Sequence, residues 1–120
     1  MFRSFSGENK ISEIIIDVGG DLITCVDSLE EMQSHLDLVC NALNMALYPP
    51  KIRQKKLKEF ITTQKPYAPS PEALKGLEWE FRRIMKQKDK KYPSINNKIV
   101  NAVAIEKAKD DYVIRALFEP

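Results

Sequence analysis

Histidine is the side chain best suited to acid–base chemistry near neutral pH, and this sequence contains one, His35. A catalytic histidine needs a nucleophile or a carboxylate within reach. If residues 28–47 form a helix, His35 has Leu38 and Val39 beside it in the next turn and Glu31 one turn back. These neighbours favour a structural or an exposed histidine over a general base.

The two thiols, Cys25 and Cys40, lie in apolar surroundings and are separated by fourteen residues. Neither has a cationic neighbour in sequence that would activate it, and their spacing is not that of a zinc site. We therefore predict reduced core cysteines, no disulfide framework and a cytoplasmic location. The sequence also has no phosphate-binding glycine loop, dinucleotide fingerprint, H-E-x-x-H or C-x-x-C motif, so we predict neither a cofactor nor a metal.

The run Ile-Ile-Ile-Asp-Val-Gly-Gly at Ile14–Gly20 resembles the first strand of ribonuclease H-like and actin-like folds, which ends on an aspartate. In those folds this aspartate binds a divalent metal, so the resemblance implies a metal-dependent, nuclease-like enzyme that uses Asp17. It covers seven residues, and a predicted helix follows where the nuclease fold has its third strand. Asp110 and Asp111 could add carboxylates, but an acidic hairpin turn accounts for them without a metal.

The elements that would position these residues begin with a predicted β-hairpin. Residues 11–18 concentrate β-branched isoleucine and valine, which pack well on a pleated surface. Gly19 and Gly20 permit the positive φ of a tight turn, and the apolar run resumes at 22–26. This pattern predicts two antiparallel strands.

The middle of the chain predicts three helices. The first covers about 28–47, where Ser28 is a good N-cap and apolar residues recur every three or four positions. The second begins at Pro50 or Lys51 and ends near Gln64. The third covers about 71–90 and follows the N-cap residue Ser70.

The last quarter of the chain can be interpreted as strand or as helix, because alanines alternate there with β-branched residues. We predict strands over 98–107 and 112–118, joined by a turn at Ala108–Asp111. With 120 residues, 43% of them hydrophobic, the chain suits one domain. The predicted fold is α+β over residues 1–120, after a flexible segment at 1–10. Its two hairpins form one antiparallel four-stranded sheet, with the three helices on one face.

Charge is distributed unevenly along the chain. Residues 1–48 carry two basic and eight acidic side chains, a net charge of −6, and residues 99–120 carry a net charge of −1. Residues 49–98 carry fourteen basic and five acidic side chains, a net charge of +9. The whole chain sums to +2, so the segment that holds the second and third helices is strongly basic.

Helical spacing gathers part of this basic charge around the only tryptophan, on the side of the third helix away from its apolar stripe. The predicted binding surface, which also includes two residues of the second helix, is Lys75, Trp79, Arg82, Arg83, Lys86, Lys90, Arg53 and Lys56. A simpler interpretation is that basic residues solvate two surface helices while the indole packs against a loop or another subunit.

The function that these patterns favour is a small, non-catalytic cytoplasmic binding module. We expect it to act through contact with another protein, or through homo-oligomerisation, using the basic face of the second and third helices. Nucleic-acid binding by the same surface is the alternative, because an indole among cations can stack on a base. The metal-dependent enzyme comes third. No window holds 18 consecutive apolar residues, so we expect no membrane partner.

Overall fold

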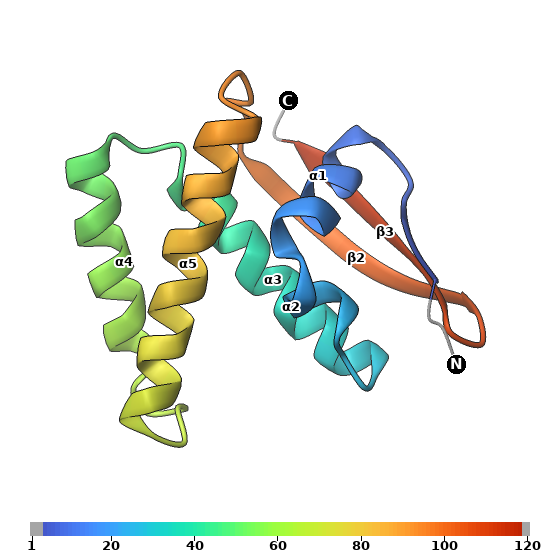
Figure 1. The fold of residues 1–120 in the computed structure, drawn as a ribbon, viewed down its shortest axis with the longest axis horizontal. Helices are drawn as coiled ribbons and strands as arrows, with labels where there is room; N and C mark the ends of the chain where they lie inside the picture. The colour runs from blue at the N-terminus through green and yellow to red at the C-terminus, as the bar shows by residue number, and fades with distance from the viewer. Residues whose placement is uncertain (1–3, 119–120) are drawn as a thin grey trace. The chain divides into compact units, whose positions relative to one another are not determined.

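The computed structural model describes residues 4–118, which contain five helices and a three-stranded mixed sheet (Figure 1). The chain is therefore of the α+β class. In chain order the elements are β1 (Ser4–Gly7), α1 (Lys10–Gly19), α2 (Asp21–Thr24), α3 (Leu29–Met45), α4 (Pro50–Gln64), α5 (Pro71–Lys91), β2 (Ile99–Ala108) and β3 (Asp111–Phe118).

The sheet has the strand order β1-β3-β2. The pair β2–β3 is the long antiparallel hairpin at the end of the chain, joined by a short turn in which Asp110 has a φ of 59° (Figure 1). β1 pairs in parallel with the other side of β3, so that Phe5 lies opposite Tyr112. The sheet thus pairs the first described segment of the chain, β1, with the last, β3.

The predicted fold, an antiparallel four-stranded sheet of two hairpins with three helices, is wrong. The segments predicted as the first hairpin, 11–18 and 22–26, contain the helices α1 and α2 instead. The sheet therefore lacks two of the expected strands and gains β1, whose parallel pairing with β3 makes it mixed.

The reason lies in which side chains of α1 are buried. Ile14, Ile15 and Val18 are at most 6% exposed, whereas Asp17 is exposed. A strand would place Ile14 and Ile15 on opposite faces, but a helix places all three on one side. The helical penalty of a β-branched residue is below about 1 kcal/mol, while burying each such side chain contributes about 1.5–3 kcal/mol. Burial outweighs the local preference.

A capping box fixes where α1 begins. The Asn9 side chain accepts a hydrogen bond from the Ser12 backbone N–H at 3.0 Å, and Ser12 Oγ accepts one from the Asn9 backbone N–H at 2.9 Å. Asn9 Nδ2 also donates to the Ala116 carbonyl at 2.7 Å, which ties the helix start to β3. At the other end Gly20 has a φ of +53°, a value that favours glycine, and it separates α1 from α2.

β1 lies in the segment 1–10 that the sequence predicted as flexible. Ser4–Gly7 form this strand, and residues 1–3 lie outside the described residues. Phe5 stacks on Tyr112 with ring centroids 5.5 Å apart. A Cβ added to Gly7 would lie 2.6 Å from the Glu13 backbone nitrogen, so glycine lets β1 approach α1 closely.

The other predicted elements are confirmed. The helices expected at about 28–47, from 50 or 51 to 64, and at 71–90 are α3, α4 and α5. The hairpin expected from strands at 98–107 and 112–118 is β2–β3. Ser28 caps α3 by accepting from the Glu31 N–H at 3.0 Å, and Ser70 caps α5 by accepting from the Ala73 N–H at 3.2 Å.

A side-chain amide from α3 binds the outer edge of β2. Gln33 Nε2 donates to the Ala102 carbonyl at 2.9 Å, and Gln33 Oε1 accepts from the Ala104 N–H at 3.0 Å. The amide thereby occupies backbone groups that a further strand would need. This device limits pairing of the exposed edge with another chain.

The contacts divide the chain into two compact units. The first, 1–41 with 97–120, contains the sheet, α1, α2 and most of α3, and α1 contacts β1 and β3. The second, 42–96, contains the end of α3 with α4 and α5, whose facing sides bring Phe60 onto Phe81 at a centroid distance of 4.8 Å. Within residues 4–118 no helix has both the length and the apolar character needed to cross a bilayer.

Replacing Asn9 tests whether its cap holds α1. We expect Asn9→Ala to lower the free energy of unfolding by about 1–2 kcal/mol, because it removes the cap and the bond to Ala116. Asn9→Asp keeps the accepting oxygen and removes only the donor to Ala116, so it should lower the free energy of unfolding by less. Urea denaturation followed by far-ultraviolet circular dichroism measures both, and an unchanged stability in Asn9→Ala would contradict this role.

Candidate functional site

The long helix α5 presents two different sides. Phe81, Ile84 and Met85 are at most 6% exposed and form its inner side. Helical geometry places Trp79 on the outer side, together with four basic residues. We call this set the Trp79 face; its members are Lys75, Trp79, Arg83, Lys86 and Lys90.

Trp79 is 60% exposed, so its indole lies on the surface of the described chain rather than inside it. Lys75, Lys86 and Lys90 are also exposed. None of these three lysines forms an ion pair with a residue of the described part of the chain. A large aromatic side chain among free cations is therefore available to another molecule.

Two arginines of the predicted surface are paired with carboxylates of their own helix. Arg82 donates to Glu78 at 2.9 Å, and Arg83 donates to Glu80 at 2.7 Å. The Arg83 pair is partly buried, with 26% of each side chain exposed. These pairs neutralise much of the arginine charge next to Trp79, and lysine supplies most of the free positive charge.

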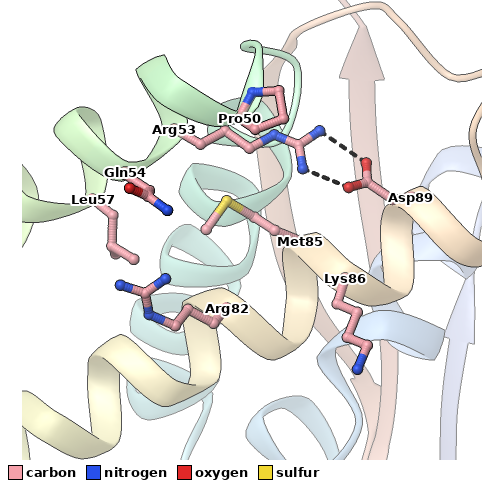
Figure 2. Close-up of a pocket in the computed structure, with 8 residues that line it drawn as sticks. All are labelled: Pro50, Arg53, Gln54, Leu57, Arg82, Met85, Lys86 and Asp89. Atoms are coloured by element: carbon pink, nitrogen blue, oxygen red, sulfur yellow. Dashed lines mark hydrogen bonds and ion pairs between the residues drawn. The ribbon is translucent and has the colours of Figure 1, made fainter.

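Arg53 of α4 has a structural role that the sequence did not indicate. Its Nε donates to the Tyr48 carbonyl at 2.8 Å, and its Nη2 donates to the Ala46 carbonyl. These are carbonyls at the end of α3, where a cation is favourable. The guanidinium also forms a bidentate pair with Asp89 of α5, at 2.5 and 2.8 Å (Figure 2). Arg53 thus joins three helices.

The remaining basic residues do not all share one side of their helices. Lys56 is exposed and its Nζ lies 5.6 Å from the centre of the Tyr48 ring, a cation–π contact. Lys51 and Lys55 lie on the side of α4 away from the buried Leu57. Lys88, in contrast, is only 5% exposed and lies on the inner side of α5.

An open groove of about 290 Å³ lies between α4 and α5 (Figure 2). Leu57 and Met85 give it an apolar floor, and Arg82 approaches Leu57 and Gln54 from the opposite helix. The Arg53–Asp89 pair closes one end. The groove is lined by Pro50, Arg53, Gln54, Leu57, Arg82, Met85, Lys86 and Asp89, so Lys86 belongs both to the groove and to the Trp79 face.

The histidine and the two cysteines have contacts and exposures that do not indicate catalysis. His35 Nδ1 lies 2.7 Å from the Leu22 carbonyl, which attaches α3 to α2, and its Nε2 lies 4.0 Å from Glu31. Burial, with a smaller contribution from Asp37, raises the pKa of Cys40 to about 12, so this thiol stays protonated at neutral pH. Cys25, expected in the core, is exposed.

Asp17 lies on the exposed side of α1 and does not end a strand. The strand on which the resemblance to nuclease-like folds depended is therefore not formed. Among residues 4–118, no three side chains of histidine, cysteine, aspartate or glutamate are grouped so that they could hold a metal ion.

Part of this site could have been found in the sequence. The spacing of Glu78 from Arg82 and of Glu80 from Arg83 is that of helical ion pairs. It indicates that the charge of the two arginines is partly neutralised. The groove has no such local signal, because its floor comes from residues 57 and 85 on different helices.

The Arg53–Asp89 pair predicts a specific loss of stability in acid. The Arg53 hydrogen bond holds the pKa of Asp89 below its usual 3.8, so the unfolded chain binds this proton more readily. The contribution of the pair to the free energy of unfolding is complete above the pKa that Asp89 has in the unfolded chain. It disappears as the pH falls through the lower pKa that Asp89 has in the folded protein. We expect wild type to be more stable than Asp89→Asn at neutral pH, and the difference to shrink below about pH 5.

Urea titrations of both proteins between neutral and acid pH measure this difference. A difference that stays constant down to the acid limit would show that the pair does not contribute as described. Glu72→Gln, which removes another carboxylate of α5 outside the groove, serves as the control.

Comparison of the chain with protein-family models, with curated proteins and with solved structures gave no match.

Proposed function

We propose that this protein is a non-catalytic binding module whose Trp79 face contacts an acidic surface of another protein. The observation that carries this proposal is the 60% exposure of Trp79 in the middle of α5, on the side opposite Phe81 and Ile84. Tryptophan is among the residues that most often dominate the energy of protein interfaces. An indole held on a rigid helix loses little freedom when a partner covers it.

The lysines of the face indicate the charge of the partner. Lys75, Lys86 and Lys90 lie on the same side of α5 as the indole and are exposed. Lysine suits the solvated rim of an interface rather than its centre. Cations in such a rim attract an acidic partner and raise the rate of association. We therefore expect an acidic protein surface with an apolar or aromatic group that covers Trp79.

The carboxylates of α5 favour a protein over a nucleic acid. Glu78 and Glu80 already occupy Arg82 and Arg83, the residues best suited to bidentate phosphate contacts. A phosphate backbone that followed the helix would also approach both carboxylates. A protein partner avoids this repulsion, because its own acidic and apolar groups can be placed individually.

The proposal includes a cytoplasmic location. Cys25 and Cys40 are both free, and unpaired thiols are typical of reducing compartments.

Titration with a synthetic peptide of glutamate and leucine tests this function. We expect Trp79→Ala to weaken binding by about 2 kcal/mol, and Lys75→Glu/Lys90→Glu to weaken it by about tenfold or more. Trp79→Ala should keep the thermal midpoint of wild type, since the indole is exposed, whereas the charge change at Lys90, in the last turn of α5, should lower the midpoint only slightly. Isothermal titration calorimetry measures the affinities.

The matched control is Lys51→Glu/Lys55→Glu, which makes the same charge change on the outer side of α4. If it weakens binding as much as the α5 variant, general charge rather than the Trp79 face is responsible. A single-stranded oligonucleotide is titrated in parallel at the same ionic strength. Tighter binding of the oligonucleotide, or no binding of the acidic peptide, would overturn the proposal.

A further inference from the structure

The groove between α4 and α5 combines an apolar floor with a cationic rim. Leu57 is 1% exposed and Met85 is 6% exposed, and both line the groove. Asp89 is the single acidic residue of the lining, and Arg53 holds it in a bidentate pair. Arg82 and Lys86 therefore leave the rim positive. Such a groove suits one apolar side chain flanked by carboxylates.

Arg82 can take part despite its bond to Glu78. Its side chain is 55% exposed and that of Glu78 is 40% exposed. Exposed ion pairs of this kind contribute little to stability, so a new carboxylate can replace Glu78 at little cost. Lys86 forms no ion pair in the described chain and needs no such exchange.

The division of the chain into two units is also a division of charge. The second unit, residues 42–96, carries thirteen basic and five acidic side chains, a net charge of +8. The first unit, 1–41 with 97–120, carries six basic and twelve acidic side chains, a net charge of −6. Each copy of the protein therefore supplies both a basic groove and a complementary acidic surface.

Within the described residues of the first unit, one exposed apolar side chain is set between carboxylates. The exposed large hydrophobic residues of this part are Leu29, Val100, Val103 and Leu117. Among these only Leu29, which is 38% exposed, has an exposed acidic residue on each side, Asp27 and Glu30. We call residues 27–31 the Leu29 corner.

The backbone of the Leu29 corner is held in place. Ser28 Oγ accepts from the Glu31 N–H at 3.0 Å, and Glu31 Oε2 accepts from the Asp27 N–H at 3.1 Å. Glu31 is thus used within the corner, whereas no hydrogen bond or ion pair of the described residues engages the carboxylates of Asp27 and Glu30. The corner presents one apolar side chain and two available carboxylates with little flexibility to lose on binding.

We propose that the groove of one copy receives the Leu29 corner of a second copy. Leu29 covers the apolar floor formed by Leu57 and Met85, while Asp27 and Glu30 pair with Arg82 and Lys86. This contact rests on the proposed function, because it names one acidic protein partner for the basic side of the second unit. It joins unlike surfaces, so each copy can donate its corner and accept another.

Sedimentation velocity over a range of protein concentrations tests the contact. We expect self-association that weakens as salt is raised, because the rim pairs are solvent-exposed and screened. Leu29→Ala should raise the dissociation constant by about tenfold or more, since it removes the apolar anchor. Leu117→Ala removes another exposed leucine of the first unit and should leave the constant unchanged. A monomer at every concentration would overturn the proposal.

Mixing two charge variants tests whether unlike surfaces meet. Glu30→Lys damages the corner and Lys86→Glu damages the groove, so each alone should remain monomeric. A mixture of the two should form heterodimers, because the groove of the first and the corner of the second are intact. If the mixture stays monomeric, or if Lys51→Glu/Lys55→Glu also abolishes association, the proposed contact is wrong.

The same variants separate this contact from the proposed function. Leu29→Ala leaves every residue of the Trp79 face in place, so its affinity for the acidic peptide should equal that of wild type when both are measured below the concentration at which wild type associates. If the protein stays monomeric and still binds the peptide through Trp79, the proposed contact is refuted and the proposed function is retained. A chain that associates through Leu29 but does not bind the peptide would refute the function alone.

Discussion

One guanidinium group connects the three helices of the second unit. Arg53 binds two carbonyls at the end of α3 and the Asp89 carboxylate, and its position on α4 brings the three helices to one point. The long separation of Arg53 from Asp89, 36 residues, makes this pair a tertiary constraint rather than a local one. It closes one end of the groove and holds α4 against the helix that carries Trp79.

The charge of the protein follows its architecture. The basic side chains gather in the helical unit of residues 42–96, and the acidic ones in the unit that contains the sheet. Within the helical unit the arginines are largely engaged, Arg53 in the fold and Arg82 and Arg83 with neighbouring glutamates, whereas the lysines of the Trp79 face are free for a partner. Positive charge therefore has two uses, one structural and one available for binding.

Local signals predicted the elements that carry the site, and long-range packing decided the rest. Ser28 and Ser70 marked helix starts correctly because capping involves residues three positions apart. The isoleucines of α1 favour a strand by local preference, but the buried positions have the three- and four-residue spacing of a helix. The parallel pairing of β1 with β3 joins opposite ends of the chain, and the bidentate pair of Arg53 joins two helices. No local pattern indicates either contact.

Quenching of the single tryptophan by small ions tests the central claim, an exposed indole in positive surroundings, most directly. Iodide should quench Trp79 fluorescence more effectively than caesium, because the lysines attract the anion, and added salt should reduce the difference. Equal quenching by the two ions, or Trp79 fluorescence that neither ion quenches, would contradict an exposed indole in positive surroundings.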